Sequence, residues 1–185
     1  MIKGLCILGS TGSIGVQALN VCENLKINVV SLIAKSNNKL MEEQIRRHRP
    51  KVAVMQDEKA ASELKQAVKD TNTKVLAGDD GIIEAVTNND ADTVLTSVVG
   101  IAGLLPTVAA INAGKNIALS NKETLVTAGS IITELAKEKG VRIFPVDSEH
   151  SAIFQCLAGN RNRDVEKIIL TASGGPFRGY TKEQL

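Results

Sequence analysis

The chain has 185 residues, which suits one domain with an appendage or one modest α/β unit. Its 22 basic and 20 acidic residues give a net charge of +2, and it has one Tyr and no Trp, so the basic and aromatic surfaces that bind nucleic acids are excluded. No apolar run approaches the length of about 18 residues that spans a membrane, and no signal-peptide pattern opens the chain, so we expect a cytoplasmic protein without a membrane partner.

The composition also indicates the kind of core. Hydrophobic residues make up 43% of the chain and aromatic residues only 2%, so the core must be aliphatic. This composition favours a parallel sheet covered by helices on both faces. Three cysteines, Cys6, Cys22 and Cys156, form no paired motif, and we expect them to be small buried side chains.

Short apolar runs alternate with helical patterns along the chain. In chain order, strands are predicted at residues 5–8, 28–34, 52–55, 74–76, 93–98, 116–119, 141–144 and 167–171, and helices at 13–25, 40–48, 59–69, 81–86, 104–113 and 122–139. Pro106 falls in the first turn of its helix, and Gly140 is expected to end the last helix in a left-handed conformation. The alternation predicts right-handed βαβ units in an α/β fold, a Rossmann-like, doubly wound, mostly parallel sheet.

A change of composition near Pro145 predicts a domain boundary. Residues with acidic, hydroxyl and imidazole side chains follow Pro145, and a charged stretch comes next at residues 160–167. We therefore expect a Rossmann-like domain over residues 1–146 and the beginning of a second, α+β domain over residues 147–185.

The first predicted strand ends in GSTGSIG, residues 9–15, a variant of the dinucleotide fingerprint. Gly9 permits a tight turn, Gly12 lets backbone approach a pyrophosphate, and Gly15 lets the helix pack against the strand. Free N–H groups at the start of the helix face the anion. The alternative is a glycine-rich turn that binds nothing, but the position between a strand and a helix favours the cofactor.

The loop after the second predicted strand bears on the choice of cofactor. NAD-binding proteins usually place an acidic residue there for the ribose hydroxyls, whereas this chain has Lys35-Ser36-Asn37 and then Lys39. No carboxylate would repel a 2′-phosphate and two lysines would attract one, which favours NADP over NAD. The alternative is a solvated loop with no ligand.

Ser120, Asn121, Lys122 and Glu123 lie at the carboxyl end of a predicted strand, where open α/β sheets bind ligands. Ser120 and Glu123 have the spacing of a capping box, which requires no function. However, a lysine at a helix N-terminus opposes the helix dipole, which suggests that Lys122 serves a phosphate, a carboxylate or a carbonyl group.

The stretch PVDSEH, residues 145–150, places Asp147 and Glu149 two residues apart. In extended backbone such side chains point the same way, and two carboxylates suit Mg²⁺ or Mn²⁺ rather than zinc. The alternative is that both carboxylates cap and charge the N-terminus of the next helix. Farther along, Ser173 opens a Ser-Gly-Gly-Pro turn, which taken alone is typical of a loop.

Taken together, GSTGSIG, SNKETLV, PVDSEHSAIFQ and TASGGPFR, in this order and spacing, closely resemble 1-deoxy-D-xylulose 5-phosphate reductoisomerase. The stretch VGIAGLLPT, residues 99–107, is also similar to that family. The resemblance spans essentially the whole chain, and PVDSEH is its most specific motif. It implies an NADPH-dependent and Mg²⁺- or Mn²⁺-dependent oxidoreductase that rearranges and reduces 1-deoxy-D-xylulose 5-phosphate to 2-C-methyl-D-erythritol 4-phosphate, a step of isoprenoid precursor synthesis.

The resemblance also implies roles for individual residues. Positions that match cofactor contacts are Thr11, Gly12, Ser13, Ile14, Asn121 and Glu123. Positions that match substrate contacts are Lys122, Ser148, Glu149 and Ser173, and Asp147 and Glu149 match two of three metal carboxylates. Lys122, Asp147 and Glu149 are thus the expected catalytic residues. The family usually has a Gly-basic-Asn run for the 2′-phosphate, of which only Asn37 matches here, so Lys35 and Ser36 depart from it.

The family continues beyond the point that corresponds to Leu185, with a third metal carboxylate, a flexible lid and a helical domain. We therefore expect this chain to be part of a longer protein or a truncated form that binds NADPH and turns over poorly alone. Family members are typically homodimers. The alternatives are another NADP-dependent sugar-phosphate reductase, a semialdehyde dehydrogenase with Cys156 as nucleophile, or a non-catalytic NADPH-binding module.

Overall fold

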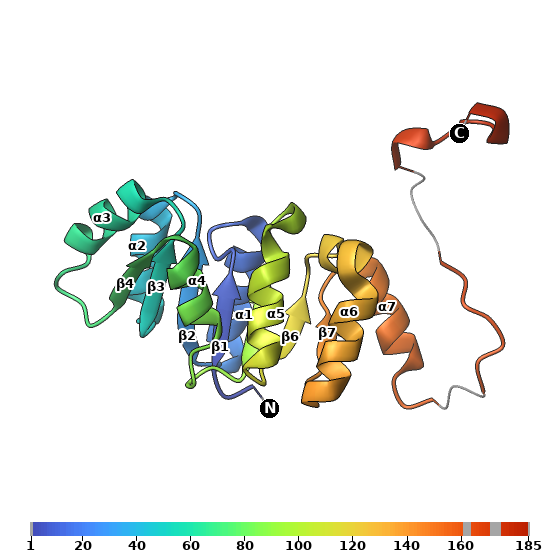
Figure 1. Ribbon diagram of the computed structural model, residues 1–185, viewed down its shortest axis with the longest axis horizontal. Coiled ribbons are helices and arrows are strands. Elements are labelled where there is room, and N and C mark those ends of the chain that lie inside the picture. Colours follow the sequence, from blue (N-terminus) through green and yellow to red (C-terminus); the bar gives the residue numbers. More distant parts are fainter. Residues whose placement is uncertain (1, 161–163, 171–174, 185) are drawn as a thin grey trace. The chain divides into compact units, whose positions relative to one another are not determined.

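The structure, a computed structural model, describes residues 2–160, 164–170 and 175–184 (Figure 1). The chain divides into two compact units, Met1–Asp147 and Ser148–Leu185. The first unit holds the whole sheet, and the second holds one α-helix and short 3₁₀ turns among its described residues. Within the described part of the chain, no helix is both long enough and apolar enough to cross a bilayer.

A seven-stranded sheet of parallel strands forms the centre of the first unit, in the order β4-β3-β2-β1-β5-β6-β7. The strands are β1 (Leu5–Leu8), β2 (Val29–Ala34), β3 (Val52–Met55), β4 (Lys74–Ala77), β5 (Thr93–Thr96), β6 (Asn116–Leu119) and β7 (Ile143–Pro145). The chain winds outward from β1 in one direction and then returns to start β5 on its other side. This is the doubly wound arrangement that the strand–helix alternation predicted, and the fold class is confirmed.

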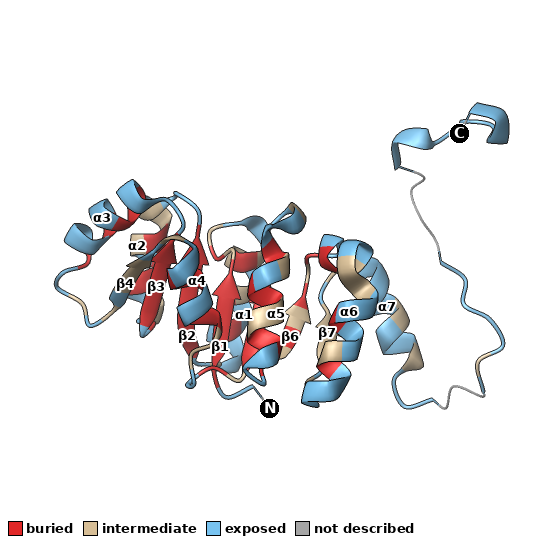
Figure 2. Cartoon of the chain, in the orientation of Figure 1, coloured by how far each residue is buried: buried red, intermediate tan, exposed pale blue. Residues whose placement is uncertain are grey.

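Six helices cover the two faces of this sheet (Figure 1). They are α1 (Ser13–Leu25), α2 (Asn38–His48), α3 (Glu58–Ala67), α4 (Gly78–Val86), α5 (Leu104–Asn112) and α6 (Glu123–Lys139), and a 3₁₀ helix, η1 (Gly100–Gly103), precedes α5. The buried side chains of α1, α2 and α3 pack on one face, and those of α4, α5 and α6 pack on the other. The sheet is therefore buried on both sides, as Figure 2 shows for its central strands.

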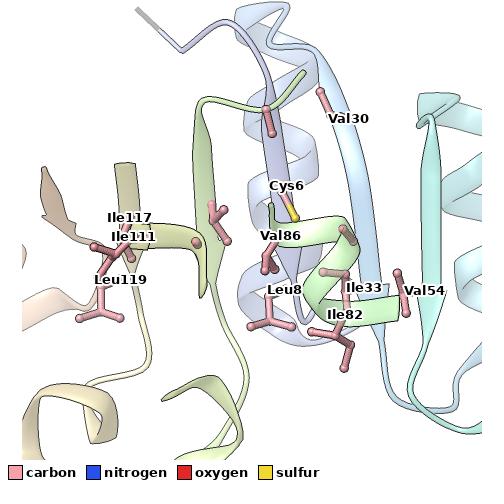
Figure 3. Packing of buried hydrophobic residues seen from close by; sticks show 14 of the residues in the cluster. Cys6, Leu8, Val30, Ile33, Val54, Ile82, Val86, Ile111, Ile117 and Leu119 are labelled. Atoms are coloured by element: carbon pink, nitrogen blue, oxygen red, sulfur yellow. The ribbon is translucent and has the colours of Figure 1, made fainter. Parts of the chain in front are cut away.

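The strand β1 shows how one short apolar run supplies both cores. Successive side chains of a strand point to opposite faces. Cys6 and Leu8 accordingly belong to the cluster under α4, α5 and α6 (Figure 3), whereas Leu5 and Ile7 belong to the cluster under α1, α2 and α3. All four side chains are buried, which explains why β1 is apolar throughout and not alternating.

The helix ends agree with their local chemistry. The predicted stop at Gly140 is confirmed, because Gly140 has φ +64° and its N–H donates to the carbonyls of Ala136 and Lys137. Helix α2 begins two residues before its predicted start, because the side chain of Asn37 accepts a hydrogen bond from the Leu40 N–H at 3.1 Å.

The second unit contains α7 (Ser148–Leu157) and the 3₁₀ turns η3 (Gly175–Phe177) and η4 (Lys182–Gln184). Two expectations are wrong here. Residues 167–170, the described part of the strand expected at 167–171, form no strand, since an isolated strand has nothing to pair with. Cys156 is exposed and not buried, because α7 buries none of its residues, whereas Cys6 and Cys22 are buried as expected.

Candidate functional site

The carboxyl ends of the parallel strands gather several loops at one edge of the sheet. Strands β1 and β5 are neighbours here, and their following segments leave toward opposite faces of the sheet. Such a reversal of strand order creates a crevice in which open α/β sheets bind ligands. The predicted glycine turn follows β1, and the segment from Ser97 to Gly103 follows β5, so both border this crevice.

Steric constraints explain two of the three glycines in the turn. Gly9 has φ +97°, and a Cβ placed there would lie 2.8 Å from the Ser97 carbonyl oxygen. A Cβ on Gly15 would lie 2.3 Å from the Gly9 carbonyl oxygen, so α1 packs against the turn too closely for any side chain. By contrast, a Cβ on Gly12 would meet nothing closer than 3.4 Å, so the protein itself leaves space at that position.

The first turn of α1 exposes backbone donors. Gly12 is the N-cap and has no side chain to satisfy them, and the first intrahelical bond runs from the Val16 N–H to the Gly12 carbonyl. Within the described residues, the N–H groups of Ser13, Ile14 and Gly15 find no protein acceptor. Together with the positive end of the helix dipole, these groups form a cradle that fits a phosphate.

Side chains from two neighbouring elements hold the glycine turn in place. The Gln44 amide, on α2, donates to the Ser10 carbonyl at 2.8 Å, and the Ser97 hydroxyl, after β5, donates to the Leu8 carbonyl at 2.8 Å. Neither Gln44 nor Ser97 was predicted from the sequence. Gln44 lies beside Met41 and Ile45 on the buried face of α2, and a polar side chain at helical spacing within an apolar stripe is the signal that pointed to it.

The loop after β2 carries the residues predicted to meet a 2′-phosphate. Lys35, Ser36 and Asn37 are exposed, and Lys39 is exposed on the first turn of α2. The side-chain oxygen of Asn37 caps α2, which leaves its amide nitrogen available, and no acidic residue stands between positions 35 and 39. The loop is therefore basic, accessible and held by a structural cap.

Asn121 ties together two loops of the carboxyl edge. Its side chain is only 2% exposed, and its amide nitrogen donates to the Val98 carbonyl at 2.5 Å and to the Gly100 carbonyl at 2.8 Å. Its side-chain oxygen accepts from the backbone N–H of Thr124 at 3.0 Å and from the Thr124 hydroxyl at 2.5 Å. The cap of α6 is thus supplied by Asn121, and the alternative interpretation of a capping box between Ser120 and Glu123 is wrong.

The Asn121 side chain and its hydrogen bonds to Val98, Gly100 and Thr124 are called the clamp below. Exposed residues surround this clamp. Lys122 and Glu123 are exposed at the start of α6, with their side chains accessible to a ligand. Three aliphatic side chains nearby are also exposed although they are large, namely Val99 at 89%, Ile101 at 65% and Leu105 at 73%. The edge of the crevice therefore combines the charged side chain of Lys122 with apolar surface.

The two predicted metal carboxylates belong to different compact units. Asp147 closes the first unit, two residues after β7, and Glu149 lies in the first turn of α7. The extended backbone expected over residues 147–149 is wrong, because α7 already begins at Ser148. An acidic residue in the first turn of a helix interacts favourably with the helix dipole. The position of Glu149 therefore agrees with the alternative interpretation, in which the carboxylates charge the N-terminus of α7.

No group of three His, Cys, Asp or Glu side chains able to hold a metal ion is present among the described residues. Ser148 is the first residue of α7, and Ser173 lies outside the described residues. In the second unit, α7 and residues 165–170 enclose a largely apolar groove of about 560 Å³, which Ser148 and Glu149 help to line.

Comparisons with known proteins identify one family. A family model described as 1-deoxy-D-xylulose 5-phosphate reductoisomerase matches residues 5–129, and the model of that enzyme's C-terminal domain matches residues 143–185. The reductoisomerase of Ruminiclostridium cellulolyticum is 54% identical over 185 residues, which is all of this chain and 49% of that protein. The chain therefore spans about half the length of the curated relatives it matches.

Solved structures give the same result. The reductoisomerase of Zymomonas mobilis in complex with NADPH superimposes with a TM-score of 0.89 at 41% identity, covering 98% of this chain and 48% of that one. A reductoisomerase in complex with NADPH, fosmidomycin and magnesium superimposes with a TM-score of 0.80 at 38% identity, covering 85% of this chain and 39% of that one. The chain belongs to the 1-deoxy-D-xylulose 5-phosphate reductoisomerase family.

Proposed function

We propose that this chain is the NADPH-binding part, and the beginning of the metal- and substrate-binding part, of a reductoisomerase. The whole protein converts 1-deoxy-D-xylulose 5-phosphate to 2-C-methyl-D-erythritol 4-phosphate for isoprenoid precursor synthesis. The observation that carries the proposal is the glycine turn at the reversal of strand order, with three unsatisfied N–H groups at the start of α1. The reaction is inferred from the membership of this chain in the reductoisomerase family.

The geometry of the turn and of the crevice supports the following proposed cofactor contacts. The turn from Gly9 to Ile14, with Thr11, Gly12 and Ser13, holds the pyrophosphate through backbone N–H groups. The exposed aliphatic side chains after β5 offer apolar surface to the nicotinamide ring, and Asn121 and Glu123 border the same crevice. NADPH supplies a hydride when bound, and the protein orients it and excludes water.

The loop after β2 selects NADPH over NADH. Lys35 contributes positive charge, and Ser36 and the free amide nitrogen of Asn37 contribute hydrogen-bond donors to the 2′-phosphate. This set differs from the Gly-basic-Asn run typical of the family, but it contains no carboxylate that would repel the phosphate. The charge therefore comes from the first position of the run and not from the second.

The substrate and metal residues lie after β6 and β7. Lys122 is exposed at the carboxyl edge, and its ammonium group stabilises negative charge on substrate oxygens. Asp147 and Glu149 are oxygen donors of the kind that hard cations prefer, so they fit Mg²⁺ or Mn²⁺, and such an ion acts as a Lewis acid toward substrate oxygens. Ser148, Glu149 and Ser173 are the proposed substrate contacts in the second domain, which we place at residues 147–185.

The substrate, the cellular location and the oligomeric state are inferred from the family. The substrate is a sugar phosphate, and the full-length protein is a cytoplasmic homodimer. The 185-residue chain carries two of the metal carboxylates, and its described residues gather no three-ligand group. We therefore expect the chain by itself to bind NADPH but to show little or no turnover.

Calorimetric titration of the purified chain with NADPH and with NADH tests the proposal. NADPH should bind at least roughly tenfold more tightly, because a basic loop adds charge-assisted contacts to one more phosphate. Lys35→Glu should remove this preference and leave NADH binding unchanged. Lys137→Glu is the matched control, because Lys137 is an exposed lysine in the last turn of α6, at the opposite edge of the sheet, and its replacement should preserve the preference.

Two results contradict the proposal. The first is a chain that binds NADPH and NADH equally well or binds neither, since the glycine turn would then not be a cofactor site selective for NADPH. The second is turnover of 1-deoxy-D-xylulose 5-phosphate by the 185-residue chain, with Mg²⁺ or Mn²⁺, at the rate of a full-length relative. That result would show that the carboxylates of this chain suffice for the reaction.

A further inference from the structure

Gln44 is a buried polar residue that no step of the proposed reaction uses. It lies on α2, its side chain is 5% exposed, and its amide nitrogen donates to the backbone carbonyl of Ser10 at 2.8 Å. One helical turn earlier, the Met41 sulfur lies 3.9 Å from the Ser10 hydroxyl. Ser10 is the second residue of the glycine turn and is fully buried, so α2 holds this residue by both its main chain and its side chain.

The bond from Gln44 fixes the direction of one peptide group. The peptide bond between Ser10 and Thr11 is trans, like every peptide bond among the described residues, so the carbonyl of Ser10 and the N–H of Thr11 point in opposite directions across their shared peptide plane. Because Gln44 draws the carbonyl toward α2, the Thr11 N–H is turned away from α2. Among the described residues this N–H has no protein acceptor, and it precedes the three unsatisfied donors at the start of α1.

The second polar atom of the Gln44 amide group, its oxygen, indicates that packing does not explain this residue. Its amide oxygen is buried and has no hydrogen-bond partner within the described part of the chain. A buried polar atom without a partner is unfavourable, and a methionine of similar length would avoid it among the apolar neighbours Met41 and Ile45. What a methionine cannot supply is the donor to the Ser10 carbonyl.

We propose that Gln44 is a positioning residue for the dinucleotide pyrophosphate. It holds the Ser10–Thr11 peptide so that the Thr11 N–H joins the N–H groups of Ser13 and Ile14 as a donor to phosphate oxygens. Gln44 touches neither cofactor nor substrate and acts through the peptide alone. This inference rests on the proposed NADPH site.

The test compares two ligands on the 185-residue chain. NADPH contains the pyrophosphate, whereas adenosine 2′-monophosphate contains the 2′-phosphate and no pyrophosphate. Gln44→Met removes the donor and keeps the length of the side chain, and Gln44→Leu removes the donor with a shorter apolar side chain, so either suffices if the other does not fold. Gln66→Met, on the exposed face of α3, is the matched control. Dissociation constants are measured by titration, and thermal unfolding confirms that each variant is folded.

We expect NADPH to bind about tenfold more weakly to both Gln44 variants, which corresponds to one oriented hydrogen bond, while adenosine 2′-monophosphate binds as to the unaltered chain. Unchanged NADPH affinity in a folded Gln44 variant overturns the inference. An equal loss of affinity for both ligands also overturns it, because Gln44 would then support the fold in general. If the unaltered chain does not bind NADPH, the proposed function fails together with this inference. The titration of the unaltered chain therefore separates a failure of the proposed function from a failure of this inference alone.

Discussion

Replacement of Asn121 by aspartate is the most direct test of the clamp at the carboxyl edge of the sheet. The two side chains have the same shape, but an ionised aspartate cannot donate to the carbonyls of Val98 and Gly100, which now receive hydrogen bonds of 2.5 and 2.8 Å. Because Asn121 is 2% exposed, water cannot replace these bonds without rearrangement of the loops.

The magnitude follows from counting the groups left without partners. Each buried polar group that loses its partner costs about 1–3 kcal/mol, so two carbonyls give a loss of about 2–6 kcal/mol in the free energy of unfolding. The native states of domains are usually stable by only about 5–15 kcal/mol, so the loss is a large part of the total. For a domain of this size it lowers the melting temperature by roughly 5–20 °C.

Urea unfolding monitored by circular dichroism measures this effect, with the dependence on urea concentration compared between variants to establish that the same transition is observed. Asn20→Asp, an exposed asparagine on α1, is the matched control and should change the free energy of unfolding by less than about 0.5 kcal/mol. If Asn121→Asp unfolds within about 0.5 kcal/mol of the unaltered chain, the clamp does not stabilise the fold and the reasoning is refuted.

Three further outcomes can be measured on the same chain. Gly15→Ala should abolish NADPH binding and destabilise the fold by more than about 2 kcal/mol in urea unfolding, because its Cβ would lie 2.3 Å from the Gly9 carbonyl oxygen. Burial lowers the pKa of His48 below its unfolded value, so its neutral form favours the fold, and the free energy of unfolding should decrease as the pH falls below about 6.5, with a smaller decrease in His48→Gln. A thiol reagent at neutral pH should modify only the exposed Cys156 until denaturant is added, because burial raises the pKa of the Cys6 thiol to about 12 and also raises that of Cys22.

The sheet could be predicted from the sequence because each of its strands is a short apolar run between helical patterns. The run from Leu5 to Leu8 is buried on both faces, so its unbroken hydrophobicity, and not an alternating pattern, was the informative signal. The glycine turn was equally accessible, because close packing at Gly9 and Gly15 leaves room for no other residue. In both cases a local steric requirement restricts the residue type.

Other features could not be predicted, because two local solutions are available and the tertiary structure chooses between them. Ser120 and Asn121 are both good cap residues, each with a suitable partner three residues later. Asn121 becomes the cap because it also reaches the Val98 and Gly100 carbonyls, which come from a distant part of the chain. The residues after β7 present the same ambiguity, since an extended stretch and a helix N-terminus both accept Asp147 and Glu149, and α7 begins at Ser148.

The site is thus maintained by side chains that bind the main chain of neighbouring loops. Gln44 binds the loop after β1, Ser97 binds the end of β1, and Asn121 binds the loop after β5. Since a parallel sheet fixes the strands but not the loops that follow them, these bonds determine where the backbone donors of the crevice point. Loss of cofactor binding on mutation of Asn121 would therefore not by itself identify a contact with NADPH. A direct contact between Asn121 and NADPH is established only if an Asn121 variant loses more binding free energy than the loss of the clamp's hydrogen bonds explains.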